Sequence, residues 1–334
     1  MNQRVALSEN RHSAIVSVFA AFGVLWLLAG LPMNVNLLVL ASLFGVLLIG
    51  LPHGGFDHRV GERLIKQCGW EPALFIFVAV YLLIAAAVVL GWFLVPLFTI
   101  LIFFALSAWH FGLEEDVNDE PVQRRWITKL IAFSRGGMVI WVPCWLQSDA
   151  VIGLLQTTVP LQNVDDVQMA VLLWGVTWPI WMSLLVWDIL RSGKTSASKA
   201  SRFLGIDWVV SVRLMAFFLL FSIANPLLSF TIYFCCWHSV RGLTQLYRDY
   251  QGSIGTFFAE LLPISVAAVI LFLIGWGFWA VRIGWHDGAI RIVFVGLSAV
   301  AIPHLLLHVM VKILAERSLK ERRGRSALME GTGV

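Results

Sequence analysis

Five histidines lie on strongly hydrophobic segments, and their type and spacing could do chemistry: His53, His110, His238, His304 and His308. Ionisable groups inside a bilayer are costly and tend to face the interior of a helix bundle. A divalent metal satisfies several neutral imidazoles at once, and imidazole suits iron, zinc, copper or nickel better than magnesium or calcium. The simpler alternative is that each histidine is a hydrogen-bonded packing residue.

Two spacings refine the hypothesis of a shared metal. His304 and His308 are four residues apart, so on a helix both side chains point to the same face. Asp57 follows His53 by four residues. A carboxylate placed there can accept the second ring N–H of a metal-bound histidine and fix its tautomer. We therefore expect Asp57 to support the ligands of a metal centre from behind.

Several other chemistries lack their motifs. The sequence contains no HExxH, GxSxG, Walker A or HxxHH pattern, which argues against zinc-protease, serine-hydrolase, nucleotide-binding and desaturase-like diiron sites. The four cysteines form no CxxC pair and indicate no disulfide framework. The histidines remain the strongest candidates for a reactive site.

The elements that must position these histidines are membrane helices. Of the 334 residues, 59% are hydrophobic and only 13% are charged, and the mean hydropathy is +0.83. These values exclude a soluble globular, disordered or nucleic-acid-binding protein. Ten segments have the length of spanning helices: residues 14–31, 35–52, 73–91, 94–112, 126–147, 168–190, 207–225, 226–247, 257–282 and 290–314. We expect an all-α polytopic transmembrane helical bundle.

The distribution of basic residues predicts the orientation of this bundle. Of the 24 Lys and Arg, 20 fall in segments that the model of ten helices places on the cytoplasmic side, and Arg282 and Arg291 fall outside. Both termini are then cytoplasmic, and residues 1–334 form a single integral membrane domain with tails at 1–13 and 316–334. The helices that carry the five histidines all run inward, which puts the imidazoles at a similar depth.

Five motifs occur in order around these histidines: LPHGGFDH, SAWHFG, FSRGG, WHSVRG and PHLLLH. Together they resemble the Brp/Blh family of bacterial and archaeal membrane β-carotene 15,15′-dioxygenases, over roughly residues 50 to 310. The resemblance implies an Fe²⁺-dependent enzyme of the cell (inner) membrane. It would cleave the central double bond of β-carotene, or of a related carotenoid, with O2 to give two molecules of retinal.

The resemblance also implies a set of site residues. His53, His110 and His238 match iron ligands of the family, but Gly242 stands where the family commonly has a second histidine after WHxxR. We expect His304 to supply the fourth ligand, with His308 as the alternative. The departure at Gly242 leaves two other possibilities: iron held by three histidines and solvent, or an activity that is altered or lost. Arg135, in the FSRGG segment, and Asp57 are expected to support the ligands.

The substrate of such an enzyme is a carotenoid dissolved in the lipid bilayer, which can enter a tunnel between helices without an aqueous step. Four aromatic residues beside the histidines are candidates to line that tunnel: Phe56, Trp109, Phe111 and Trp237. A retinal-binding opsin could accept the product. Two other functions fit the sequence: a non-catalytic carotenoid or retinal carrier that assists an opsin, and an electron-transfer protein with bis-His haem b.

Overall fold

The computed structural model describes most of the hydrophobic part of the chain, at residues 34–115, 126–195, 202–203, 206–311 and 313–314. The predicted helix 14–31 and both predicted tails lie outside the described residues. Each of the other nine predicted helices has a helical counterpart in the part that is described.

Helical segments account for almost all of the described residues. In the first half they are α2 (Val35–Gly45), η1 (Val46–Gly50), η2 (Leu51–Gly54), α3 (Asp57–Gln67), α4 (Ala73–Leu94), α5 (Pro96–Glu115), α6 (Trp126–Leu146), α7 (Ser148–Leu155), η3 (Gln156–Thr158) and η4 (Leu161–Asn163). In the second half they are α8 (Val164–Val176), α9 (Trp178–Thr195), α10 (Trp208–Ile223), α11 (Pro226–Thr231), η6 (Ile232–Ser239), α12 (Val240–Asp249), α13 (Ile254–Ile283), α14 (Trp285–Arg291) and η7 (Ile292–Gly296).

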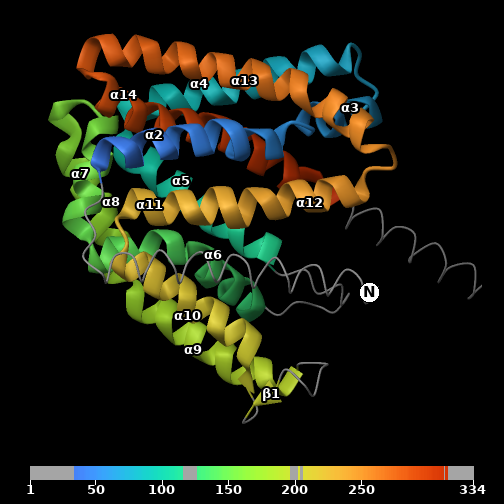
Figure 1. Ribbon diagram of the computed structural model, residues 1–334. Helices are drawn as coiled ribbons and strands as arrows, with labels where there is room; N and C mark the ends of the chain where they lie inside the picture. Colours follow the sequence, from blue (N-terminus) through green and yellow to red (C-terminus); the bar gives the residue numbers. More distant parts are fainter. Residues whose placement is uncertain (1–33, 116–125, 196–201, 204–205, 312, 315–334) are drawn as a thin grey trace, which may run out of the picture.

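The last helix continues beyond η7, so that Trp285–Val311 forms one apolar helix of 27 residues. A pair of two-residue antiparallel strands, β1 (Arg202–Phe203) and β2 (Ile206–Asp207), joins α9 to α10. In Figure 1, α4 and α13 lie along the upper edge, α9 and α10 along the lower edge, and α2, α5 and α11–α12 between them.

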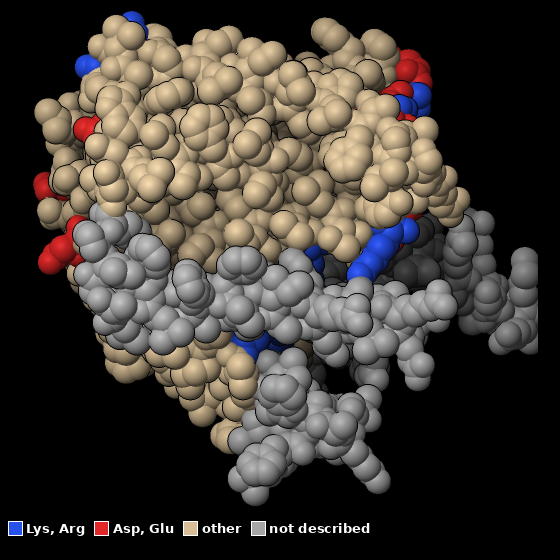
Figure 2. Space-filling model, in the orientation of Figure 1, with Lys and Arg blue, Asp and Glu red and all other residues tan. Residues whose placement is uncertain are grey.

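The architecture is the predicted all-α membrane bundle. Among the described residues, five helices are long and apolar enough to cross a bilayer, and α6 with the segment after it forms a sixth candidate bent by 105°. The helix Ala73–Leu94 faces outward, since only 6% of its most apolar window is buried. Figure 2 shows the same property on one face, where uncharged side chains cover the middle and most charged side chains gather at the two ends.

Prolines separate consecutive helices where the hydrophobic sequence is almost continuous. Pro96 and Pro226 each begin a helix, at the first position, where the missing N–H costs nothing. Asn225 caps the second of these helices, because its side chain accepts a hydrogen bond from the backbone N–H of Leu227 at 2.9 Å. The two turns predicted near residues 92–96 and 225–226 are therefore confirmed.

Helix α7 is a feature that the predicted helices did not include. It turns away sharply after Leu146, and Gln147 stabilises the corner. The side-chain amide of Gln147 donates to the backbone carbonyls of Phe221 and Ala224, both at 2.9 Å. Those carbonyls lie in the last turn of α10 and directly after it, where the helix itself offers no partners. The corner between α6 and α7 is thus fixed to the turn before α11.

Helices α5 and α6 pack against each other with their backbones in close contact. A Cβ atom added at Gly112 would lie 1.9 Å from the backbone oxygen of Ala132, and one added at Gly136 would lie 2.3 Å from that of Ala108. Both contacts are shorter than any real Cβ contact, so only glycine allows the two helices to approach this closely.

Candidate metal centre

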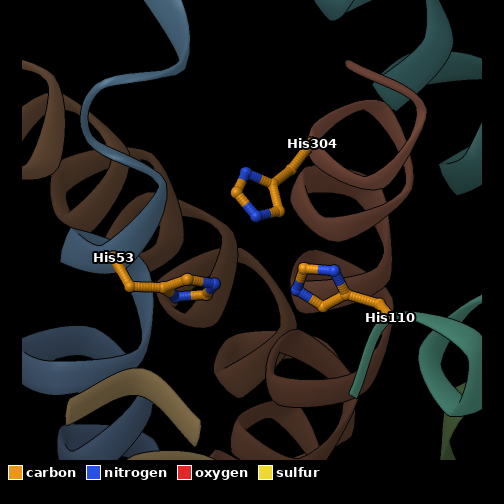
Figure 3. Close-up of side chains that lie close together, drawn as sticks. All are labelled: His53, His110 and His304. Atoms are coloured by element: carbon orange, nitrogen blue, oxygen red, sulfur yellow. The ribbon is translucent and has the colours of Figure 1, made fainter. Parts of the chain in front are cut away.

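Four of the five membrane histidines converge in the interior of the bundle. The ring centroid of His53 lies 5.1 Å from those of His238 and His304. The ring centroid of His110 lies 5.1 Å from that of His238 and 5.4 Å from that of His304. The four rings, which we call the histidine cluster, come from helices far apart in the sequence, and Figure 3 shows three of them turned toward one another.

The nitrogen atoms of the cluster are close enough for a common ion. One ring nitrogen from each of His53, His110 and His304 lies within 4.8 Å of the others. Two bonds of roughly 2.0–2.1 Å, the Zn–N length, place their nitrogen atoms at most about 4.2 Å apart. Ring movements of under about 1 Å would therefore bring these atoms to bonding distance.

Hydrogen bonds behind the rings fix which nitrogen faces the centre of the cluster. His53 Nδ1 lies 2.5 Å from the backbone oxygen of Gly50, and His304 Nδ1 lies 2.8 Å from both carboxylate oxygens of Asp57. A carbonyl or a carboxylate only accepts, so Nδ1 carries the proton in both rings. The other nitrogen, Nε2, then presents its lone pair, which is the form that binds a metal.

Asp57 is itself held in place. It is 7% exposed, and the hydroxyl of Tyr81 lies 3.4 Å from its Oδ2 while donating to the backbone oxygen of Val300 at 2.8 Å. The sequence led us to expect Asp57 behind a histidine of the centre, and His304 is that histidine. Its neighbour His53 bonds to Gly50 instead, because residues 51–54 form a 3₁₀ turn that breaks the α-helical spacing between His53 and Asp57.

Irregular helix geometry positions two of the four histidines. His53 lies in η2, directly after the π-helix η1, and His238 lies within the π-helix η6. π-helical turns are rare and occur often at functional sites. A Cβ atom at Gly50 would lie 2.5 Å from the Phe234 ring, so glycine is needed for η1 and η6 to meet. The sequence reasoning missed these turns.

His308, the fifth membrane histidine, lies beside the cluster and outside it. Its ring centroid is 4.4 Å from that of His304 and 6.1 Å from that of His110, but its side chain is exposed. It can also group with Asp57 and His304 around an ion. Because it is exposed, whereas the Nε2 atoms of His110, His238 and His304 each expose less than 1 Å², the buried cluster is the better-formed centre.

The donor set fits a divalent transition metal. The cluster offers neutral imidazole nitrogens in an apolar environment, with a carboxylate behind one ring, and this is the usual second-layer arrangement at histidine-ligated metals. Imidazole-rich sites suit iron, zinc, copper and nickel, whereas magnesium and calcium prefer oxygen. Gly242 borders the site, since a Cβ atom there would lie 3.7 Å from Cδ2 of His53.

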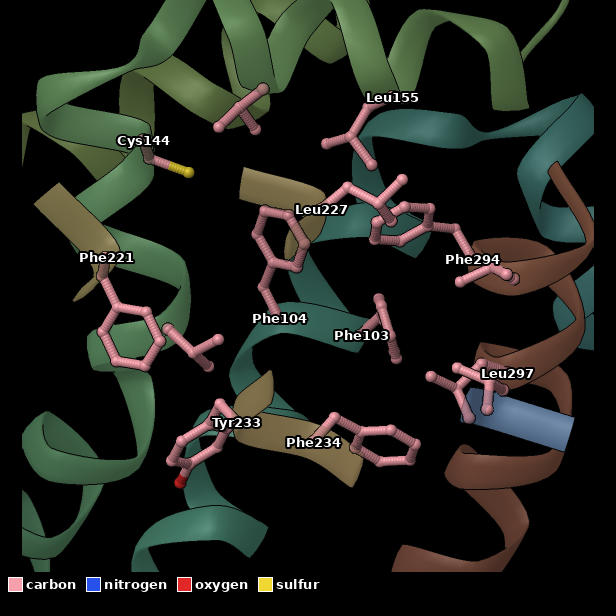
Figure 4. Packing of buried hydrophobic residues seen from close by; sticks show 14 of the residues in the cluster. Phe103, Phe104, Cys144, Leu155, Phe221, Leu227, Tyr233, Phe234, Phe294 and Leu297 are labelled. Carbon is pink, nitrogen blue, oxygen red and sulfur yellow. The ribbon is translucent and has the colours of Figure 1, made fainter. Parts of the chain in front are cut away.

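An apolar cavity adjoins the cluster, with about 1030 Å³ of empty space between its lining atoms when the part open to the surroundings is counted. The rings of His53, His110, His238 and His304 form one end of its lining, and the walls beyond them are almost entirely hydrophobic. Figure 4 shows buried side chains around this space, with Cys144 and Leu155 on one side of the view and Phe234 on the other. An extended hydrophobic ligand could therefore lie with one of its atoms against the histidines.

Only one of the four predicted substrate-lining aromatic residues borders this cavity. Phe111 does, with its ring centroid 4.6 Å from that of His238. Phe56 packs in a separate cluster, stacked on Phe257 at 5.3 Å. Trp109 and Trp237 are not among the described residues that line the cavity. Consecutive helical residues point about 100° apart, so a neighbour of a histidine can face elsewhere.

Two of the aromatic residues that line the cavity precede His238 at helical spacing. Phe230 and Phe234 precede His238 by eight and four residues, and their rings stack at 5.4 Å. Phe230 also contacts Phe294 of the last helix at 5.6 Å. Residues four apart share a helix face, so counting back in fours from His238 could have found two of these residues.

Arg135 forms an ion pair with Asp188, and the expectation that it supports the ligands stays a prediction. Its Nε donates to Asp188 Oδ2 at 2.6 Å, and the pair joins α6 to α9. Both side chains are largely buried, at 15% and 9% exposure. Arg135 is not among the described residues that line the cavity. Its ion pair with Asp188 holds α6 against α9.

Comparison with known proteins gives the chain a family. A family model described as beta-carotene 15,15′-dioxygenase matches residues 44–312. The chain is also 29% identical over 283 residues to a protein named beta-carotene 15,15′-dioxygenase from an uncultured marine bacterium 66A03, covering 82% of this chain and 94% of that protein. No solved structure matches the chain. Because the family model spans the helices that carry the whole histidine cluster and more than half of the chain, the chain belongs to the beta-carotene 15,15′-dioxygenase family.

Proposed function

We propose that this protein is an iron-dependent dioxygenase of the cell membrane that cleaves the central double bond of β-carotene, or of a closely related carotenoid, into two retinal molecules. The observation that carries the proposal is the position of the buried histidine cluster at one end of a hydrophobic cavity inside a membrane bundle. The family and the similar bacterial protein support the same reaction.

His53, His110, His238 and His304 would hold the iron through their Nε2 atoms. Iron(II), when bound, supplies the redox chemistry that lets O2 react with an alkene. The bonds from Nδ1 to Gly50 and to Asp57 would hold the Nε2 atoms of His53 and His304 in the acceptor form. Neutral ligands would leave the ion its full positive charge, and the carboxylate of Asp57 lies behind the His304 ring.

The cavity would orient the substrate. A carotenoid partitions into the bilayer because of the hydrophobic effect, so it can reach a lipid-embedded cavity without passing through water. Phe111 and Phe234 offer flat rings beside the histidines, at 4.6 and 5.6 Å from the His238 ring. Such rings suit contact with a conjugated chain. The hydrophobic walls would also exclude water from the reacting alkene.

Expression in bacteria that make β-carotene tests the activity. We expect loss of the orange pigment and accumulation of retinal with the wild-type chain. His286→Ala serves as the matched control, because His286 pairs with Asp287, away from the cluster, and should leave activity intact. Well-expressed protein that leaves the pigment unchanged would contradict the proposal. Pigment that copurifies unchanged would favour a carrier, and a Soret band would favour haem b.

A further inference from the structure

The two ends of the hydrophobic cavity differ in the side chains that line them. The histidines lie together at one end, and the residues at the other end come from the α6–α7 corner and the start of α11, where Cys144, Leu155 and Pro226 line the space. Cys144 and Leu155 are buried, at 3% and 1% exposure. This end is lined by buried hydrophobic side chains, so a chain that extends from the cluster toward them meets those side chains.

The distance between the two ends of the cavity can be worked out from the helices that form its walls. Pro226 and His238 both line the cavity on one continuous helical segment, 12 residues apart, or at most about 18 Å at the α-helical rise. Phe294 and His304 on the last helix are 10 residues apart, or about 15 Å. Gln147 bonds to Ala224, which places the start of α7 level with Pro226.

This depth matches one half of the proposed substrate. A fully extended peptide covers roughly 3.3–3.6 Å for three bonds, so an extended carbon chain advances about 1.2 Å per bond. From the central double bond to the far edge of its terminal ring, β-carotene has about twelve bonds in line, or roughly 14 Å. A terminal ring against Leu155 would therefore leave the central double bond beside the histidine cluster.

We infer that the end of the cavity at Cys144 and Leu155 acts as a depth stop that selects the bond to be cleaved. The inference rests on the proposed function and deepens it, since it makes these residues specificity-determining. The terminal ring of the substrate abuts the stop, and the double bond at the histidines is the one that breaks. Cleavage of that C=C bond by O2 forms two C=O groups, one oxygen atom in each product, and needs no further reactant.

Changing the depth should move the cleavage position. Leu155→Trp shortens the cavity, so the terminal ring stops nearer the histidines. The double bonds of a conjugated chain repeat every two carbons, or about 2.4 Å. The larger side chain in the Leu155→Trp variant shortens the cavity by about that length. With a one-ringed apocarotenoid as substrate, we expect the ring-bearing carbonyl product to become shorter than retinal by at least two carbons. Leu155→Ala should act in the opposite direction. Ala150→Trp is the matched control, since Ala150 is an exposed α7 residue outside the lining.

Product analysis by liquid chromatography and mass spectrometry separates the possible outcomes. Retinal as the sole ring-bearing product of Leu155→Trp, even at a reduced rate, would overturn the depth stop while leaving the proposed function intact. Should that variant fail to accumulate, Cys144→Phe provides the same test.

Wild-type protein supplies a further test with apocarotenoids that keep one ring and are trimmed at the other end. Retinal from every one of them supports the depth stop, and cleavage at varying distances from the ring contradicts it. No cleavage by wild type would refute the proposed function itself.

Discussion

Asp57→Asn should weaken iron binding without removing any ligand. Both carboxylate oxygens lie 2.8 Å from Nδ1 of His304, and the two side chains are only 7% and 6% exposed. A hydrogen bond to a charged group contributes roughly 1.5–3 kcal/mol, and about 1.4 kcal/mol corresponds to a tenfold change in Kd. Loss of a second-layer partner typically lowers metal affinity about 10- to 100-fold. We therefore expect the Kd for Fe²⁺ to rise about 10- to 100-fold.

Anaerobic titration of the metal-free protein with Fe²⁺ against a competing chelator measures this change. Glu62→Gln is the matched control, because it also removes a carboxylate from α3, where Glu62 pairs with Lys66 at 2.7 Å on the surface. An Asp57→Asn protein whose Kd stays within about twofold of the Glu62→Gln value would refute the reasoning, since one pair of carboxylate bonds would then contribute almost nothing. Equal melting temperatures of the two variants would show that the comparison concerns the site.

Three further substitutions test how the bundle holds the centre. Gly112→Ala should lower the melting temperature measurably, because the new Cβ would lie 1.9 Å from the Ala132 oxygen; an unchanged melting curve would contradict the close approach. Arg135→Leu should destabilise the fold by about 3–5 kcal/mol in a denaturant titration by leaving Asp188 buried and uncompensated, and Arg135→Leu/Asp188→Leu should recover much of that loss. Phe234→Ala should leave iron content unchanged and lower turnover of β-carotene at least severalfold, whereas wild-type turnover would remove Phe234 from the substrate path.

The sequence predicted the spanning helices that have counterparts among the described residues, and it suggested that their histidines meet. Spanning helices can be predicted because every backbone group in lipid must be bonded within its own segment, and the length follows from bilayer thickness. The similar depth of His53, His110, His238 and His304 followed from counting spans, since alternate helices run in the same direction. The cytoplasmic location of the termini stays a prediction, because it depends on the membrane and on tails that lie outside the described residues.

The direction of individual side chains was not predictable from neighbourhood in the sequence. Trp237 precedes His238, yet its ring packs 5.5 Å from the Phe217 ring instead of in the cavity. Phe234, four residues before the histidine, is the residue that shares its face. π-helical turns then change the phase of the helix, and they leave no strong signal in hydropathy. The partner of Arg135 lies 53 residues away, so no local pattern indicated it.

Iron content per chain is the most direct test of the histidine cluster. We expect purified wild-type protein to carry about one iron ion, as one shared centre implies. His53→Ala, His110→Ala, His238→Ala and His304→Ala should each lose most of it. His286→Ala and His308→Ala should retain it, because the first lies elsewhere and the second is exposed beside the cluster. Full iron occupancy in any of the four cluster variants, or equal loss in all six proteins, would contradict a metal held by these rings.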